Sequence, residues 1–257
     1  MNDPRAGAQC ERLRRREAGG LRAGQARLRR LAGPVQVING KRPRYRSVVF
    51  DLDGTLADTE PLVLGCMLET INGHGHAVDE ELLLKYIGPP LPVMLNNMLG
   101  LSAEQAQPIY MDYLRRYEDV YMPQTRPLPG AEPLLDALCE ANVPLAIVTN
   151  KREDAGRKTV ELLDWTDRFE TIIGADTASD PKPHPAPLLY ALEILAGEPE
   201  SSVMVGDTES DMGAGRNAGF AGVIGIVGVR DDEYLRRFGA TDTAGDLAGV
   251  QNLLFDS

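Results

Sequence analysis

Short apolar runs alternate with amphipathic stretches along the chain after residue 46. Runs rich in valine, isoleucine and leucine predict strands over residues 47–50, 144–149, 170–173, 202–205 and 222–227. Between them, apolar residues at helical spacing predict helices over residues 131–141, 155–163, 187–195 and 212–218. Alternating strands and helices are typical of βαβ units, so the pattern predicts an α/β fold with a parallel sheet and helices on both faces.

One long segment interrupts this alternation. Residues 61–128 contain no convincing strand, and their pattern predicts helices over residues 61–71, 80–87, 91–99 and 103–121. Because the segment follows the first strand, we expect a small helical lid inserted after the tip of that strand. A stripe of large side chains at helical spacing is expected to form the core of this lid: Tyr110, Tyr113, Leu114, Tyr117 and Tyr121.

The first 46 residues differ from the rest of the chain in charge. They hold 13 of the 27 basic residues but only 3 of the 38 acidic ones, although the whole chain has a net charge of −11. This Arg-rich stretch predicts a disordered extension, with a transit peptide or a nucleic-acid-binding arm as alternatives. The body would then comprise residues 47–60 and 129–257, and its acidity argues against nucleic acid as a partner.

The lengths of the apolar runs and the spacing of the cysteines indicate where in the cell the protein is expected. No apolar run reaches the roughly 18 residues that a membrane-spanning helix needs, so we expect no membrane partner. Cys10, Cys66 and Cys139 match no zinc spacing and no disulfide framework, which favours a reducing, cytoplasmic location. The sequence is compatible with a monomer or a homodimer.

Polar groups follow the predicted strands at the points where the apolar runs end. Because the carboxyl ends of parallel strands meet at one edge of a sheet, where ligands bind, these groups are expected to converge. Two of them are carboxylates one residue apart, directly after the first strand, which suggests a metal-assisted reaction on an anion. In chain order the groups are Asp51, Asp53, Thr149, Asn150, Lys182, Asp207 and Asp211.

In their order and spacing these groups resemble the motifs of the haloacid dehalogenase superfamily, in the branch with a helical cap after the first motif. Residues 56–59, 128–130 and 182–185 add a resemblance to the phosphoglycolate phosphatases of that branch. Residues 51–55 (Asp-Leu-Asp-Gly-Thr) resemble the first motif, Thr149-Asn150 the second and Lys182 the third. Gly206-Asp207, with Asp211, resembles the fourth. The resemblance covers roughly residues 47–250 and implies a Rossmann-like α/β core with an inserted all-α cap domain.

The chemistry of a phosphatase can be assigned to these side chains. Asp51 is the natural nucleophile, since a carboxylate that attacks phosphorus gives an acyl-phosphate that water can cleave. Asp53 can protonate the leaving oxygen and then take a proton from the attacking water. The Thr149 hydroxyl and the Asn150 backbone N–H can donate to the phosphoryl oxygens, while Lys182 supplies a positive charge.

The gathered acids predict a divalent cation. Each pair of carboxylates 4 Å apart would cost about 4 kcal/mol at an effective dielectric constant near 20. All-oxygen ligation together with a phosphate favours Mg²⁺. The resemblance implies that the Asp51 side chain, the Asp53 backbone carbonyl and Asp207 bind it. Asp211 would lie nearby, either bound through water or orienting Lys182.

We therefore expect a Mg²⁺-dependent phosphatase for a small phosphorylated metabolite resembling phosphoglycolate, acting through an aspartyl-phosphate intermediate. A phosphosugar mutase similar to β-phosphoglucomutase and an inorganic pyrophosphatase remain the alternatives. The resemblance also implies that Lys85, in the predicted lid, is a candidate substrate-binding residue.

Overall fold

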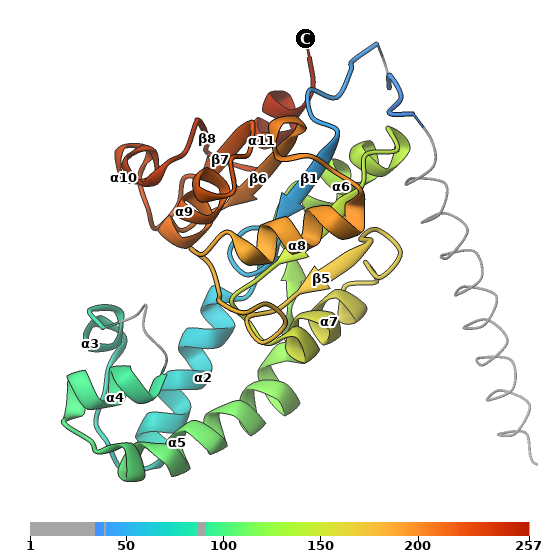
Figure 1. The fold of residues 1–257 in the computed structure, drawn as a ribbon. Helices are drawn as coiled ribbons and strands as arrows, with labels where there is room; N and C mark the ends of the chain where they lie inside the picture. The colour runs from blue at the N-terminus through green and yellow to red at the C-terminus, as the bar shows by residue number, and fades with distance from the viewer. Residues whose placement is uncertain (1–33, 39, 87–90, 257) are drawn as a thin grey trace, which may run out of the picture. The chain divides into compact units, whose positions relative to one another are not determined.

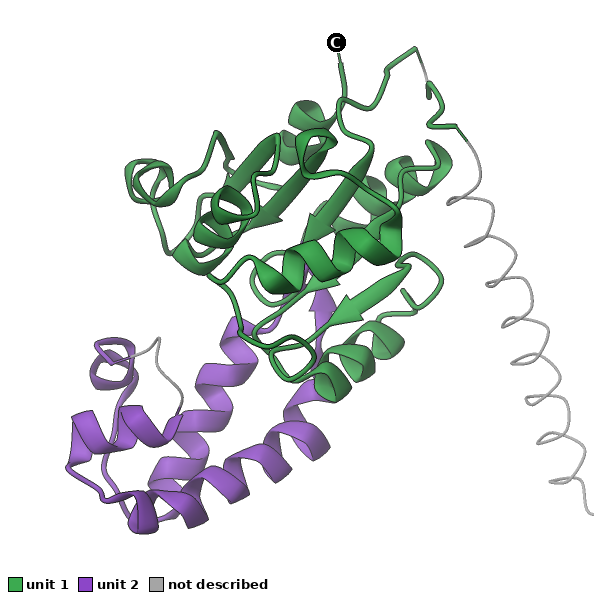
Figure 2. Ribbon diagram, viewed as in Figure 1, with its two compact units in different colours: residues 1–55, 129–257 green, residues 56–128 purple. Residues whose placement is uncertain are grey.

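The computed structural model describes residues 34–38, 40–86 and 91–256. The greater part of the predicted basic extension, residues 1–33 and 39, therefore lies outside the described residues, together with Cys10. The chain divides into two compact units, one formed by residues up to 55 together with residues from 129 onward, and one formed by residues 56–128 (Figure 2).

The first unit is built on a six-stranded sheet in the order β5-β4-β1-β6-β7-β8 (Figure 1). All five strand pairs are parallel. The predicted α/β fold with a parallel sheet is confirmed. Its strands are β1 (Ser47–Phe50), β4 (Leu145–Val148), β5 (Thr171–Ile173), β6 (Ser202–Gly206), β7 (Gly222–Ile226) and β8 (Asp242–Ala244).

Helices cover both faces of this sheet because its strands are apolar on both sides. On one face, α8 and α9 pack on a core that includes Val49, Ala146 and Met204. On the other face, α6 and α11 contact each other (Figure 1). The helices of this unit are α6 (Ala131–Glu140), α7 (Glu153–Leu162), α8 (Ala186–Leu195), α9 (Glu209–Asn217), α10 (Asp232–Phe238) and α11 (Leu247–Leu254), with a 3₁₀ turn at Pro199–Ser201.

Residues 34–46, apart from position 39, lie against the core. The backbone N–H of Arg44 donates to the carbonyl oxygen of Leu254, and Pro43 forms an antiparallel bridge with Phe255. The expected start of the folded part at residue 47 is therefore too late. Backbone pairing anchors this segment, and such pairing leaves no apolar pattern in the sequence.

The second unit is mainly helical and has its own apolar core around Ile71, Leu83 and Leu95. It contains α2 (Glu60–Gly73), α3 (Glu80–Leu84), α4 (Leu91–Leu99) and α5 (Ala103–Arg116), followed by a π-helical turn (Tyr117–Tyr121) and a 3₁₀ turn (Met122–Gln124). Of the predicted tyrosine stripe, Tyr117 is buried, and Tyr110 and Tyr113 pack on this core.

A short antiparallel ribbon joins the two ends of the second unit. It pairs β2 (Ala57–Asp58) with β3 (Arg126–Pro127) and was not predicted, because two residues per strand give no alternating pattern. The backbone N–H of Leu128 also donates to the carbonyl oxygen of Leu56. Across the described residues of both units, none of the helices is long and apolar enough to cross a membrane.

Candidate active site

The polar groups predicted from the sequence lie at the carboxyl ends of three neighbouring strands. β1 is at the centre of the sheet, between β4 and β6, and the chain order reverses direction across it. Such a reversal leaves an open crevice at the carboxyl ends of the strands, where α/β proteins bind ligands. Asp51 follows β1, Thr149 follows β4 and Asp207 follows β6.

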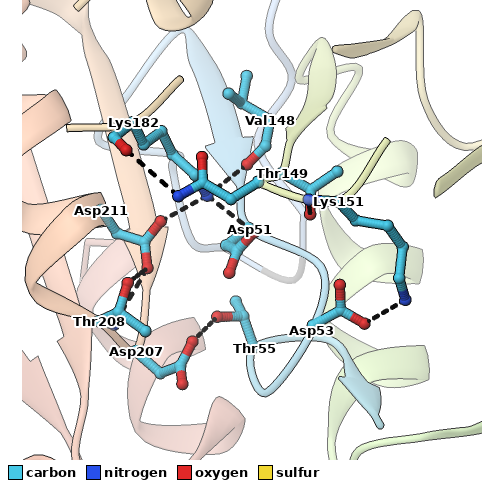
Figure 3. Close-up of polar contacts among 11 residues, drawn as sticks. Asp51, Asp53, Thr55, Val148, Thr149, Lys151, Lys182, Asp207, Thr208 and Asp211 are labelled. Atoms are coloured by element: carbon cyan, nitrogen blue, oxygen red, sulfur yellow. Dashed lines mark hydrogen bonds and ion pairs between the residues drawn. The ribbon is translucent and has the colours of Figure 1, made fainter. Parts of the chain in front are cut away.

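A buried lysine connects two of the predicted acids (Figure 3). Lys182 Nζ donates to Asp51 Oδ1 at 2.8 Å, to Asp211 Oδ1 at 2.6 Å and to the Val148 carbonyl oxygen at 2.7 Å. The Lys182 side chain is 2% exposed and the Asp211 side chain is 0% exposed. An ammonium group has three hydrogens, so these acceptors use its full donor capacity and fix its position.

Asp211 itself is held from the other side. Its Oδ2 accepts hydrogen bonds from the Thr208 backbone N–H at 3.0 Å and from the Thr208 hydroxyl at 2.6 Å. Gly206 permits this approach, because a Cβ atom at that position would lie 2.4 Å from Asp211 Cγ. Of the two expected roles for Asp211, the geometry favours the orientation of Lys182.

Asp207 faces the same cluster from the end of β6. Its Oδ1 accepts a hydrogen bond from the Thr55 hydroxyl at 2.9 Å. Gly54, with a φ of +75°, brings the loop after β1 so close that a Cβ there would lie 2.7 Å from Asp207 Oδ2. Two residues of the sequence Asp-Gly-Thr therefore help to position Asp207. The glycine leaves room for its carboxylate, and the threonine donates a hydrogen bond to it.

Burial and crowding disturb the titration of this cluster. Burial raises the pKa of Asp51 to about 7, although the charge of Lys182 opposes the rise. Burial also raises the pKa of Asp207 to about 8, and the charges of Asp51 and Asp211 add to it. For Lys182, burial alone would lower the pKa, but Asp211 and Asp51 outweigh it and raise the pKa above its usual range. The single positive charge of Lys182 therefore does not neutralise the three carboxylates of Asp51, Asp207 and Asp211.

The side chains fit a divalent cation. Asp51, Asp207 and Asp211 each offer a carboxylate oxygen, and these oxygens lie within 4.8 Å of one another. Among the described residues, no hydrogen-bond donor reaches Oδ2 of Asp51 or Oδ2 of Asp207. Each of these two carboxylates therefore keeps one oxygen without a protein donor among the described residues. The predicted ligation by the Asp53 backbone carbonyl stays a prediction.

Two of the residues predicted to bind phosphate, Thr149 and Asn150, directly follow β4, the strand that pairs with β1. The buried Thr149 hydroxyl oxygen accepts the backbone N–H of Lys151 at 3.1 Å, which leaves its own hydrogen available for another acceptor. The Asn150 side chain donates to the Lys182 carbonyl oxygen at 3.2 Å and so connects β4 to the Lys182 loop. Within the part of the chain that the structure describes, no acceptor takes the Asn150 backbone N–H.

The Asp53 carboxylate lies outside the acidic cluster and forms its own ion pair. Its Oδ1 accepts from Lys151 Nζ at 2.7 Å, and the Lys151 side chain is only 14% exposed (Figure 3). We assigned Lys151 no role from the sequence. The available signal was its position directly after Thr149-Asn150, at the carboxyl end of the strand that pairs with β1.

Lys85 lies in the second unit, at the carboxyl end of α3. It is exposed and donates to Glu81 Oε1 at 2.9 Å. An exposed pair four residues apart on a helix is the ordinary arrangement of a surface lysine. Its predicted role in substrate binding stays a prediction.

Comparison with known proteins identifies the class. Residues 48–224 match the family of haloacid dehalogenase-like hydrolases. The chain is 37% identical over 193 residues to a phosphoglycolate phosphatase of Xylella fastidiosa (strain 9a5c), an alignment that spans 73% of this chain and 83% of that one. It is 29% identical over 212 residues to the pyrophosphatase PpaX of Oceanobacillus iheyensis, spanning 82% and 98% of the two chains.

Among solved structures, a hydrolase from Pseudomonas syringae superposes with a TM-score of 0.68 at 26% identity, covering 82% of this chain and 97% of that chain. The chain belongs to the haloacid dehalogenase-like hydrolase family. It is a hydrolase of the phosphatase class, as its motifs predicted.

Proposed function

We propose that this enzyme is a Mg²⁺-dependent phosphatase that hydrolyses a small phosphorylated metabolite of the phosphoglycolate type through an aspartyl-phosphate on Asp51. The observation that carries the proposal is the position of Asp51. Its carboxylate is buried at the centre of the sheet edge, bound on one oxygen by Lys182 at 2.8 Å and without a protein donor on the other among the described residues.

This arrangement suits a nucleophile. Lys182 fixes the orientation of the Asp51 carboxylate for an attack on phosphorus in line with the leaving group. Lys182 is itself fixed by Asp211 and by the Val148 carbonyl, so the nucleophile is oriented before the substrate arrives. The Thr149 hydroxyl and the Asn150 N–H would donate to the phosphoryl oxygens on which negative charge accumulates.

Asp53 would serve as general acid and then as general base. In the first half of the reaction it gives a proton to the leaving oxygen, and in the second half it removes one from the water that attacks the aspartyl-phosphate. Because its carboxylate interacts with Lys151 and lies outside the acidic cluster, it is separate from the groups that would bind the cation.

Asp51 and Asp207 would bind the cation through their second oxygens, together with the Asp53 carbonyl, while Asp211 orients Lys182. When bound, Mg²⁺ would offset the charge of the acids and of the substrate phosphate. We also propose that the substrate is a small phosphorylated molecule and that the enzyme is cytoplasmic. That it is a monomer or a homodimer stays a prediction.

Hydrolysis of inorganic pyrophosphate is the second candidate. It is favoured by the similarity to the pyrophosphatase PpaX of Oceanobacillus iheyensis over 82% of the chain. Both reactions would use the same nucleophile and the same acid–base residue, because in each the attacked atom is a terminal phosphorus.

The test is a phosphate-release assay with purified protein. Phosphoglycolate, pyrophosphate and β-glucose 1-phosphate are compared at equal concentration, with Mg²⁺ and with EDTA. We expect Mg²⁺-dependent release, fastest from phosphoglycolate, and a loss of at least about 1,000-fold in Asp51→Asn. Full activity in Asp51→Asn would refute the assignment of the nucleophile, and equal rates in EDTA would refute the cation requirement.

A further inference from the structure

The ion pair between Lys151 and Asp53 places a second lysine beside the predicted acid–base residue. Lys151 Nζ lies 2.7 Å from Asp53 Oδ1, and the side chain is 14% exposed. The Asp53 carboxylate is not one of the three carboxylates of the acidic cluster, which are those of Asp51, Asp207 and Asp211. The site therefore has one lysine on the side of the nucleophile and another on the side of the acid–base residue.

These two lysines cannot exchange roles. Lys182 already donates to Asp51, Asp211 and the Val148 carbonyl, which uses all three of its hydrogens. Its charge is also offset by two buried carboxylates that contact it. Lys182 is therefore committed to the nucleophile and cannot also bind the leaving part of the substrate.

The position of Lys151 relative to Asp53 fixes which part of a substrate it can meet. A general acid lies about 3 Å from the leaving oxygen that it protonates. With Lys151 bound to the other oxygen of the same carboxylate, its Nζ lies roughly 5–7 Å from that leaving oxygen by hydrogen-bond geometry. A carboxylate two bonds beyond the ester oxygen, or the second phosphate of pyrophosphate, can cover this distance. A methyl group in the same place would have no electrostatic attraction to the Lys151 ammonium group.

We propose that Lys151 recognises a negatively charged group on the leaving part of the substrate, and so makes the enzyme select phosphate esters and anhydrides whose leaving group is itself an anion. This inference rests on the proposed phosphatase function and deepens it. Phosphorylated hydroxy acids and pyrophosphate belong to the selected class, and simple alkyl phosphates or phosphosugars with uncharged leaving groups do not.

The experiment uses phosphoglycolate and ethyl phosphate, which differ in the carboxylate or methyl group at the far end of the leaving part. Steady-state kinetics are measured for the wild type, Lys151→Met and Lys151→Arg. Lys158→Met is the matched control, since it removes the same charge from α7, the helix that begins after the Lys151 loop. Fluorescence of Trp165, which is buried, checks that each variant is folded.

We expect wild type to prefer phosphoglycolate. In Lys151→Met, kcat/KM for phosphoglycolate should fall about 10–100-fold, mainly through KM, while the value for ethyl phosphate changes less than about threefold. Lys151→Arg should keep most of the preference and Lys158→Met all of it.

An equal loss on both substrates would overturn the proposal, because Lys151 would then act only by holding Asp53. An unchanged preference, or a wild type that favours ethyl phosphate, would overturn it as well. These results differ from failure of the phosphatase function, in which the wild type would release no phosphate from either compound.

Discussion

Replacement of Asp207 by asparagine should stabilise the protein in the absence of a divalent cation and abolish its stabilisation by Mg²⁺. The substitution keeps the shape of the side chain and an oxygen that can accept from the Thr55 hydroxyl, which Asp207 binds at 2.9 Å. It removes the negative charge and replaces the other carboxylate oxygen by an NH₂ group. An enzyme variant that is catalytically impaired but more stable than the parent would show directly that the acidic cluster costs folding free energy.

The size of the effect follows from the distances. Asp51, Asp207 and Asp211 each have one carboxylate oxygen in a group whose members lie within 4.8 Å of one another. At an effective dielectric constant near 20, one pair of charges at that separation repels by about 3.5 kcal/mol. Asp207 has two such neighbours, and Lys182 offsets roughly one of them. We therefore expect a gain on the order of 3 kcal/mol, or about 6–12 °C in Tm for a chain of this size.

The effect should depend on pH in a defined direction. The pKa values of Asp51 and Asp207 are raised from 3.8 to about 7 and about 8. Between pH 3.8 and about 8 the folded protein therefore retains protons that the unfolded chain has released, and the contribution of these groups to stability falls as pH rises. In EDTA, the advantage of Asp207→Asn should grow from about pH 4 to pH 9.

The assay is thermal unfolding followed by the fluorescence of Trp165, whose side chain is buried. Wild type and Asp207→Asn are compared in EDTA and in Mg²⁺ at pH 6 and pH 9. With Mg²⁺ at 100 times its Kd, wild type should gain about 2.7 kcal/mol, and the variant far less. The reasoning is wrong if Mg²⁺ leaves the Tm of wild type unchanged, or if the variant is less stable than wild type in EDTA at pH 9.

Three further substitutions test the geometry of the site. Lys182→Met leaves Asp51 and Asp211 without their cation, so urea titration should show a loss of about 3–5 kcal/mol; a variant as stable as wild type would contradict this. Gly206→Ala places a Cβ 2.4 Å from Asp211 Cγ, so we expect at least a tenfold lower kcat, whereas Gly73→Ala, with open space around it, should be neutral in the same assay. Thr149→Val removes a hydroxyl that would bind the phosphoryl group, so kcat should fall about 10–100-fold; an unchanged kcat would rule out the hydroxyl.

The sequence predicted the strands that carry the site more accurately than the edges of the fold. The bounds of β1 were predicted correctly, because an apolar run ends abruptly at Asp51. β8, at Asp242–Ala244, was missed because a three-residue strand at the edge of a sheet needs no apolar run. The ribbon of β2 and β3 was missed because its two halves are far apart in the chain.

Within the site, the convergence of Asp51, Lys182, Asp207 and Asp211 could be expected from parallel strands that share one edge. The hydrogen-bond partner of each side chain could not be predicted from the sequence. The contact of Asp53 with Lys151 depends on β4 lying beside β1 in the register that pairs Phe50 with Ile147. Strand order and register depend on the packing of the whole sheet, so they cannot be predicted from the local pattern of a single sequence.

Because β2 pairs with β3, the sequence and length of the second unit can change in evolution without a change in the first unit. The two ends of the second unit meet at the pair Ala57 and Pro127, so the intervening chain leaves and returns at one point. A segment attached in this way could be spliced out for one of another length or shape without stretching the backbone that joins it to the sheet. The acids and lysines that we propose for the reaction all belong to the other unit, so natural selection could remodel the inserted module and retain the chemistry.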